Sequence, residues 1–388
     1  MLVSPRQAEG VQPTAAAAES RGAKAAASWH AAFARRRATV EGRAGVNPRR
    51  RSDSFKGSSI TGAGSSCGGS SFGSSGWGSS SMSRSSSMSR SSSGSLARSD
   101  STGFGPSRFV LRQRYEDIGL RYLVHKEQLG TGEYGAVRPC VEADSGRLLA
   151  CKTIRKQQIT KHEDAEAIRT EVACLWEVRG HPGIITMHDA LEDGKRVHLV
   201  MELCEGGDLF RRVNQRGALS ERSAARVCKA LALAVLHCHR HGIMHRDIKP
   251  KNVLLLDDSD EPHIKLSDFG VATFFEDGDL LTEFAGTTQY IAPEVWKGQY
   301  GREADIWGLG ALLYFCIAGV SPYRAPTKQQ VAEAVLTQGV DFSLPCWRRV
   351  TPECIDLIAS MLNKDPYGRI TLVEVLQHPW VRRRHANA

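Results

Sequence analysis

The first 110 residues of this 388-residue chain have few acidic and few aromatic side chains. They hold 15 Lys and Arg against 5 Asp and Glu and only seven aromatic residues, whereas residues 111–388 hold 36 basic and 37 acidic side chains. The whole net charge of +9 therefore arises in the first segment. Such a segment cannot bury enough apolar surface to offset its conformational entropy. We expect residues 1–110 to be disordered and the remainder to fold.

The chain also lacks the marks of a secreted or membrane protein. None of its ten cysteines forms a Cys-x-x-Cys pair, and no apolar leader follows Met1. The longest apolar run, Trp307–Val320, is shorter than the roughly 20 residues that cross a bilayer. Leu2 stands where N-myristoylation requires glycine. We expect reduced thiols, a cytoplasmic or nuclear location, no membrane anchor, and a buried helix over the apolar run.

Two low-complexity stretches make up the first segment. Residues 1–50 are rich in Ala and Arg, which fits either plain disorder or a transit peptide for an organelle. Between Ser52 and Ser107, 25 Ser and 11 Gly fill 56 positions, which is typical of a flexible linker. Within it a seven-residue Arg/Ser unit occurs at 81–87 and again at 87–93. Such repeats are phosphorylated, contact RNA backbone, or serve only as spacers.

A change of pattern along the folded part predicts two lobes. Gly-rich and β-type segments occupy about 120–204, and longer helical patterns follow to about Trp380. Leu231–His239 and Ile355–Leu362 have the apolar spacing of buried helices. A small sheet lobe joined to a larger helical lobe is the expected α+β architecture.

The glycines at positions 130, 132 and 135 form a G-x-G-x-x-G motif, which by itself is common. A dinucleotide-binding turn of this kind needs a helix directly after its glycines. Here Val137–Cys140 and Leu148–Ile154 have strand character around the turn Asp144-Ser145-Gly146. The motif therefore predicts a hairpin whose backbone approaches phosphate groups closely.

Five further motifs follow in order: Ala150-Cys151-Lys152, Glu171, His245–Asn252, Ser267-Asp268-Phe269-Gly270 and Ala292-Pro293-Glu294. With them, residues 122–381 resemble the eukaryotic protein kinase family. The resemblance makes His245–Asn252 the catalytic loop and the last two motifs the ends of the activation segment. The resemblance implies a bilobal fold, with an N-lobe and hinge over 111–204, a C-lobe over 205–381 and a short basic tail at 382–388. It also implies ATP and Mg²⁺ as cofactors.

The resemblance assigns catalytic roles to six side chains. Lys152, paired with Glu171, would hold the α- and β-phosphates, and Lys249 would stabilise the γ-phosphate. Asp247 would accept the proton of the substrate hydroxyl. Asn252 and Asp268 would supply oxygen ligands to Mg²⁺.

The same resemblance predicts the nucleotide site. Adenine would lie between Val137, Ala150 and Leu254, beside a hinge at Glu202-Leu203-Cys204 and a gatekeeper at Met201. Asp208 would meet the ribose or a basic residue of the substrate. The full set expected to contact the nucleotide is Leu129, Gly130, Gly132, Gly135, Val137, Ala150, Lys152, Met201, Glu202, Cys204, Asp208 and Leu254.

Several segments resemble the calcium- and calmodulin-dependent kinase group, especially plant-type calcium-dependent kinases and phosphoenolpyruvate carboxylase kinases. They are Leu199–Phe210, the insert 257–262 and His378-Pro379-Trp380. Lys249 in the catalytic loop implies Ser/Thr specificity. We expect a monomeric protein serine/threonine kinase whose partners are protein substrates rather than nucleic acid. The alternative is an inactive scaffold that acts through an RNA- or partner-binding Arg/Ser tail.

Direct control by calcium is not expected. The sequence holds no D-x-[DN]-x-[DN]-G loop, and only eight residues follow Trp380. Arg246 would instead pair with Glu283, ordering the activation segment without phosphorylation; alternatively, Thr282 is a phosphorylated switch.

Two positions depart from the family pattern near the substrate. Lys251 stands where relatives usually have Glu facing basic substrate residues, and Thr288 stands where they usually have Pro. The substrate consensus of relatives is therefore not transferred to this chain. If a preference for Arg survives, Ser87 and Ser93, each three residues after an Arg, are candidate autophosphorylation sites.

Three structural roles complete the expectations. Glu294 would pair with Arg369, and Asp305 would anchor the catalytic loop. Four closely spaced histidines, at 237, 239, 241 and 245, suggest either a metal site or, for His245, core packing.

Overall fold

The computed structural model describes residues 110–111, 116–132, 135–261 and 263–383. These residues belong to one compact unit, and a second unit, Ala38–Gly103, lies outside them. Of residues 1–110, which were expected to be disordered, only Val110 is described; it is buried, and its N–H donates to Glu192 Oε1 at 2.7 Å. The rest of that segment, with the transit-peptide alternative and the Arg/Ser repeat, lies outside the described residues.

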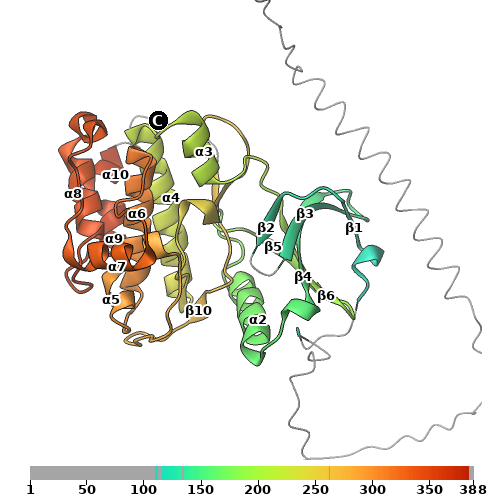
Figure 1. Ribbon diagram of the computed structural model, residues 1–388. Coiled ribbons are helices and arrows are strands. Elements are labelled where there is room, and N and C mark those ends of the chain that lie inside the picture. The colour runs from blue at the N-terminus through green and yellow to red at the C-terminus, as the bar shows by residue number, and fades with distance from the viewer. Residues whose placement is uncertain (1–109, 112–115, 133–134, 262, 384–388) are drawn as a thin grey trace, which may run out of the picture. The chain divides into compact units, whose positions relative to one another are not determined.

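The N-terminal lobe is built on an antiparallel six-stranded sheet (Figure 1). Its strands are β1 (Tyr122–Val124), β2 (Gly130–Gly132), β3 (Gly135–Glu142), β4 (Leu148–Arg155), β5 (Met187–Glu192) and β6 (Arg196–Glu202). The order is β1-β3-β4-β6-β5, and β2 pairs with β3. This pairing confirms the predicted glycine hairpin and the predicted turn between β3 and β4.

The two faces of this sheet are covered differently. On one face helix α2 (His162–Glu177) contacts β5, and Ile154 and Leu199 join the main core. On the other face a small separate core gathers Tyr122, Cys140, Leu149, Cys151, Leu191 and Val200. The short 3₁₀ helices η1 (Ile118–Leu120) and η2 (Lys156–Gln158) flank β1 and β4. Because side chains alternate along a strand, neighbours in β4 serve opposite faces.

The C-terminal lobe is helical. Its helices are α3 (Leu209–Arg216), α4 (Glu221–Arg240), α5 (Pro293–Trp296), α6 (Glu303–Ala318), α7 (Lys328–Thr337), α8 (Pro352–Met361), α9 (Leu372–Gln377) and α10 (Pro379–Arg383). Helix α4 packs on α6 and α9, and α6 packs on α8 (Figure 1). The predicted α+β architecture, a sheet lobe with a larger helical lobe, is confirmed.

Helix α6 contains most of the longest apolar run and is buried along nearly its whole length. It ends where Gly319 takes a left-handed conformation, with φ of 71°. The run is thus a core helix, as expected from its glycines and its length. Among the described residues, no helix combines the length and the apolarity that a membrane span requires.

Short elements lie between α4 and α5 and carry the polar motifs. They are β7 (Ile243–Met244), η3 (Pro250–Asn252), β8 (Val253–Leu255), β9 (Ile264–Leu266), β10 (Thr273–Phe274) and η4 (Thr288–Tyr290); η5 (Pro345–Arg349) follows α7. Strand β7 pairs with β10, and β8 pairs with β9. The catalytic-loop motif, His245–Asn252, lies between β7 and β8 and so joins these two strand pairs.

A buried ion pair ties the end of the activation segment to the helical core. Both nitrogens of the Arg369 guanidinium bind the Glu294 carboxylate, at 2.5 and 2.9 Å, and both side chains are about 95% buried. Arg369 also donates to the carbonyl oxygens of Asn363 and Glu303. The structure thus contains the pair expected from the sequence.

Candidate active site

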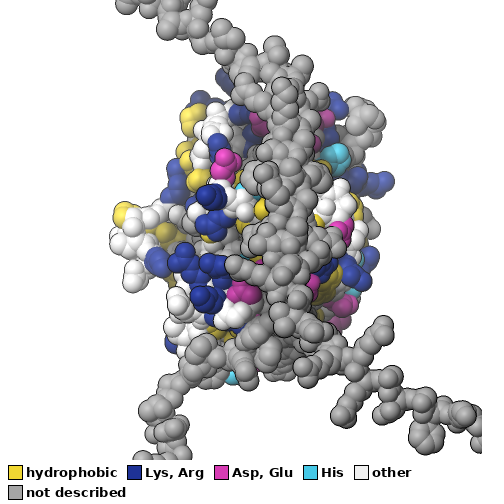
Figure 2. Space-filling model, turned by 90° about the vertical axis from the view of Figure 1, so that its right-hand side faces the viewer, with side chains coloured by type: hydrophobic (Ala, Val, Ile, Leu, Met, Phe, Trp, Pro, Cys, Tyr) yellow, Lys and Arg dark blue, Asp and Glu magenta, His cyan; other side chains and the backbone are white. Residues whose placement is uncertain are grey.

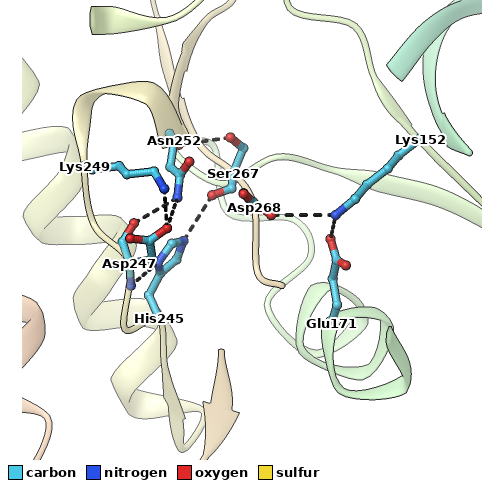
Figure 3. A network of polar contacts seen from close by, with 8 residues as sticks. All are labelled: Lys152, Glu171, His245, Asp247, Lys249, Asn252, Ser267 and Asp268. Atoms are coloured by element: carbon cyan, nitrogen blue, oxygen red, sulfur yellow. Dashed lines mark hydrogen bonds and ion pairs between the residues drawn. The ribbon is translucent and has the colours of Figure 1, made fainter. Parts of the chain in front are cut away.

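A buried lysine lies at the centre of the N-lobe side of the site. Strand β4 carries Lys152 on its inner face, and its Nζ lies 2.6 Å from Glu171 Oε1 on helix α2 and 3.6 Å from Asp268 Oδ1 (Figure 3). Burial alone would lower the pKa of Lys152, but the charges of Glu171 and Asp268 outweigh it and raise that pKa. The lysine therefore remains a cation fixed between two carboxylates.

The catalytic-loop motif is anchored by Asp305 from helix α6. Its carboxylate accepts hydrogen bonds from the backbone N–H groups of His245, at 3.0 Å, and Arg246, at 2.8 Å. His239 Nε2 lies 2.8 Å from the same carboxylate. Burial would raise the pKa of Asp305, but the His239 bond and the nearby charges of His239 and His245 lower it. Arg246 has a φ of 65°, so this anchor holds a strained backbone.

Asp247 has one carboxylate oxygen engaged and one without a partner. Oδ2 accepts from Lys249 Nζ at 2.5 Å and from Asn252 Nδ2 at 3.1 Å (Figure 3). Oδ1 is buried and has no hydrogen-bond partner among the described residues. Lys249 Nζ also donates to Thr287 Oγ1 at 2.8 Å, a link from the loop to the activation segment. An oriented carboxylate with a free oxygen is suited to accept a proton.

Asp268 and Asn252 offer the oxygen atoms expected for Mg²⁺. The Asp268 side chain is half exposed, and its backbone has a φ of 62°. Asn252 uses its amide nitrogen on Asp247, so its amide oxygen is not engaged by that contact. Ser267 fixes Asn252 from the other side, because its Oγ and N–H both donate to the Asn252 carbonyl. A carboxylate and an amide oxygen are fitting ligands for a hard divalent cation.

The glycine hairpin lies next to this centre. Gly130 pairs with Val137, and Gly132 pairs with Gly135. A Cβ at Gly135 would come within 1.9 Å of the Thr153 carbonyl oxygen, so β3 and β4 approach closely only because this residue is glycine. Leu129, at the start of the hairpin, is 54% exposed. Glu133 and Tyr134, between β2 and β3 in the sequence, lie outside the described residues.

The expected adenine-binding residues come from β3 and β4 of the N-lobe sheet and from β8 of the C-lobe. Val137 lies opposite Lys152, and Ala150 lies opposite Met201. Leu254 forms an isolated bridge with Asp208. The register of the sheet and this bridge therefore bring residues more than 100 positions apart to the hinge.

Two hinge side chains have roles that the sequence did not suggest. The Glu202 carboxylate accepts from the Thr186 N–H at 2.5 Å and pairs with Lys265 Nζ at 2.9 Å, so it is turned to the protein. Burial raises the pKa of the Cys204 thiol to about 12. Cys204 is therefore a neutral thiol at neutral pH.

Asp208 caps a helix. Its Oδ1 accepts from the Arg211 N–H at 2.8 Å, at the first turn of α3. Asp is a preferred N-cap residue, and the pattern of Asp208 before Leu209–Arg216 could have indicated this role. This capping bond engages one oxygen of the Asp208 carboxylate. The expected contact of Asp208 with the ribose or with a basic substrate residue stays a prediction.

Arg246 extends from the catalytic loop to the activation segment. Its guanidinium is 2.8 Å from Glu283 Oε2 and 3.3 Å from the Tyr300 hydroxyl, and its Nε donates to the Val271 carbonyl. The Tyr300 hydroxyl donates to the Glu283 carbonyl at 2.7 Å. The Arg246–Glu283 pair was expected, whereas no local signal pointed to Tyr300. These contacts join the two segments.

The four clustered histidines divide among separate contacts. His239 binds Asp305, and His245 binds the Ser267 carbonyl and packs edge-on against Phe269. The rings of His237 and His241 lie 4.2 Å apart. His245 is fully buried, as expected for a packing residue.

Three comparisons describe what the chain is similar to. A family model described as protein kinase domain matches residues 123–381. Calcium-dependent protein kinase 8 of Oryza sativa subsp. japonica is 44% identical over 277 residues, which cover 71% of this chain and 51% of that relative. Calcium-dependent protein kinase 17 of Arabidopsis thaliana is 41% identical over 282 residues, covering 73% and 53%. The chain thus spans about half the length of these curated relatives.

Proposed function

Because this chain belongs to the protein kinase family, we propose that it is a serine/threonine protein kinase that transfers the γ-phosphate of Mg²⁺-bound ATP to protein hydroxyl groups. The observation that carries the proposal is the arrangement around Asp247. Its Oδ2 is held by Lys249 and Asn252, and its Oδ1 is without a partner among the described residues. This free oxygen is where a substrate hydroxyl would deliver its proton.

The remaining residues supply positioning and charge rather than covalent chemistry, as phosphoryl transfer requires. Lys152 presents a fixed cation to the α- and β-phosphates, and Glu171 keeps it in place. Lys249 presents a second cation beside Asp247, where negative charge develops on the transferred group. Bound Mg²⁺, held by Asn252 and Asp268, would neutralise phosphate charge.

We infer that the activation segment is ordered without phosphorylation. The Arg246 side chain is only 8% exposed and would be costly to leave unpaired, whereas Glu283 is 74% exposed and supplies the counter-charge. The charge-assisted pair stands in for an arginine–phosphate contact.

We also propose that calcium does not act on this chain directly, although the relatives named above are calcium-dependent protein kinases. The support is compositional: the 388 residues contain no EF-hand loop motif.

The proposed activity is tested with labelled ATP, Mg²⁺ and a degenerate Ser/Thr peptide library. Full-length protein is compared with Asp247→Asn, each with and without a calcium chelator. We expect transfer that Asp247→Asn reduces by at least about 100-fold, and that the chelator does not change. ATP binding without transfer by the full-length protein would contradict the proposal and favour the scaffold alternative.

The control of the activation segment is tested separately. Phosphatase-treated protein should keep its activity, and Thr282→Ala should match it. Glu283→Gln should lower activity because it leaves Arg246 without its counter-charge. Loss of most activity after phosphatase treatment, together with inactivity of Thr282→Ala, would instead identify Thr282 as a phosphorylated switch.

A further inference from the structure

A cavity of about 560 Å³ opens on the outer face of the N-lobe sheet. We call it the arginine pocket, because Arg138, Arg155 and Arg196 line it. No carboxylate is among its lining residues, and none of the three arginines has an ion-pair partner in the part of the chain that the structure describes. Figure 2 faces the side of the molecule on which the N-lobe lies, and its visible surface carries Lys and Arg side chains interspersed with Asp and Glu.

The sheet register forces this concentration of charge. Arg155 on β4 lies directly opposite Arg196 on β6, and Arg138 lies opposite Cys151, on the same face of β4 as Arg155. Like charges directly opposite each other in a sheet are destabilising. Three unpaired cations at one cavity therefore lower the stability of the free protein, and a bound anion would relieve the repulsion.

The floor of the pocket is rigid and polar. His198 is 97% buried there, and its Nδ1 lies 3.1 Å from Thr153 Oγ1. Its Nε2 lies 3.2 Å from Asp193 Oδ2, while Asp193 Oδ1 accepts from the backbone N–H groups of Lys195 and Arg196. Asp193 is thus occupied by the turn and by His198. Asp117, the other carboxylate close to His198, accepts from the Gly119 N–H at 2.8 Å, and the arginines remain available to a ligand.

The pocket lining also includes apolar side chains. They are Ile118, Tyr122 and Val124, next to the small outer core of the sheet. The pocket therefore offers both cations and apolar surface to a ligand. A ligand that fits it carries a doubly charged anion beside an apolar group.

We propose that the arginine pocket binds a peptide in which a phosphorylated serine is followed by an apolar residue. Arginines bind phosphate oxygens through paired, charge-assisted hydrogen bonds, and phosphoserine carries nearly two negative charges at neutral pH. The chain's own Arg/Ser repeat has this pattern, since Met88 directly follows Ser87. A peptide with the sequence of 81–93 is therefore a suitable probe when supplied as a separate molecule.

The experiment measures fluorescence anisotropy of a labelled 81–93 peptide phosphorylated at Ser87, mixed with the full-length chain. The protein carries Asp247→Asn, so that it cannot modify the probe, and it is treated with phosphatase beforehand. The measurement needs no kinase activity, so its failure is separate from failure of the proposed function.

We expect the phosphorylated peptide to bind at least about tenfold more tightly than the unphosphorylated one. Adding Arg155→Ala and Arg196→Ala should remove that difference, and Arg138→Ala alone should reduce it. Arg147→Ala, at an exposed arginine outside the pocket, is the matched control and should keep it. A probe with Met88→Ser should bind more weakly.

Several results would overturn the proposal. They are equal binding of the two peptides, unchanged binding by the double arginine variant, or equal binding of a scrambled phosphopeptide. Displacement of the probe by phosphoinositide vesicles, but not by excess unlabelled phosphopeptide, would assign the pocket to a membrane instead. Circular dichroism of each variant checks that lost binding does not come from lost folding.

Discussion

A cation on the inner face of the N-lobe sheet is paired with carboxylates, whereas two arginines on the outer face have no such partner among the described residues. On the inner face Lys152 is almost fully buried between Glu171 and Asp268. On the outer face Arg155 and Arg196 lie side by side with no counter-charge among the described residues. The strands are the same, and Lys152 and Arg155 are only three positions apart in β4. Lys152 is thus neutralised by carboxylates of the protein itself, whereas Arg155 and Arg196 are available to a ligand.

Burial explains the contrast. A buried charge without a partner costs several kcal/mol, so Lys152, Arg246 and Arg369 each have a carboxylate. Arg155 and Arg196 are exposed, so water solvates them and the cost of leaving them unpaired is small. Changes at the paired residues should therefore have large effects, and changes at the unpaired ones small effects.

The largest effect on activity is expected from replacing Lys152, the paired cation on the inner face of the sheet. Lys152→Met should lower kcat/KM by about 100-fold or more, since it removes a fixed charge that stabilises the transferred phosphates. Arg147→Met, at an exposed position of the same lobe, is the control and should remain within twofold of the unmodified protein. Steady-state kinetics with labelled ATP measure both, and a fully active Lys152→Met variant would refute the catalytic role.

The buried pair in the C-lobe should dominate stability. Glu294→Gln leaves the buried Arg369 guanidinium without its counter-charge, and should reduce the free energy of unfolding by about 3 kcal/mol. Asp277→Asn breaks the pair of Asp277 with Arg302, whose side chains are 82% and 46% exposed, and should cost less than about 0.5 kcal/mol. Urea titrations of the two variants compare a buried with an exposed pair. Equal losses would contradict the role of burial.

The anchor of the catalytic loop should show a dependence on pH. The pKa of Asp305 is lowered in the folded chain, so its ionised form stabilises the fold above the unfolded value of about 3.9, and this contribution is lost as pH falls through the folded pKa. Asp305→Asn should therefore be less stable by about 1–2 kcal/mol near neutral pH. The difference should stay constant down to about pH 5 and shrink below about pH 4. Urea titrations across pH measure it, and a difference that grows with acidity would be inconsistent with this account.

The smallest change in stability is expected on the outer face of the sheet, and there the substitution should stabilise the protein rather than destabilise it. Arg196→Ala removes one of two like charges that face each other, so it should raise the free energy of unfolding by up to about 0.5 kcal/mol at low salt. Added salt should abolish the gain, because it screens exposed charges. Thermal unfolding at two ionic strengths, with Arg147→Ala as the control, checks this. A clear loss of stability would mean that Arg196 has a structural partner.

Much of the site could be predicted because its residues are defined by short motifs. Asp247, Lys249 and Asn252 lie within six positions of one another, so their meeting at one carboxylate is nearly local. The Lys152–Glu171 pair joins a strand to the next helix and was also expected. Contacts such as Lys249 with Thr287 or Arg246 with Tyr300 were not expected, because they join segments whose approach depends on packing.

The sequence by itself determined the two-lobed α+β class, the core helix over its apolar run, and the residue types that the proposed chemistry requires, because these depend on local periodicity and on short spacings. Only the tertiary structure decided which charged groups meet outside the pairs that the kinase resemblance indicated. Arg155 and Arg196 are 41 positions apart, and the register of β4 with β6 alone makes them neighbours. Lys249 likewise meets Thr287, 38 positions after it, because the activation segment packs against the catalytic loop. Such contacts follow from how elements pack, and no local pattern of residues encodes them.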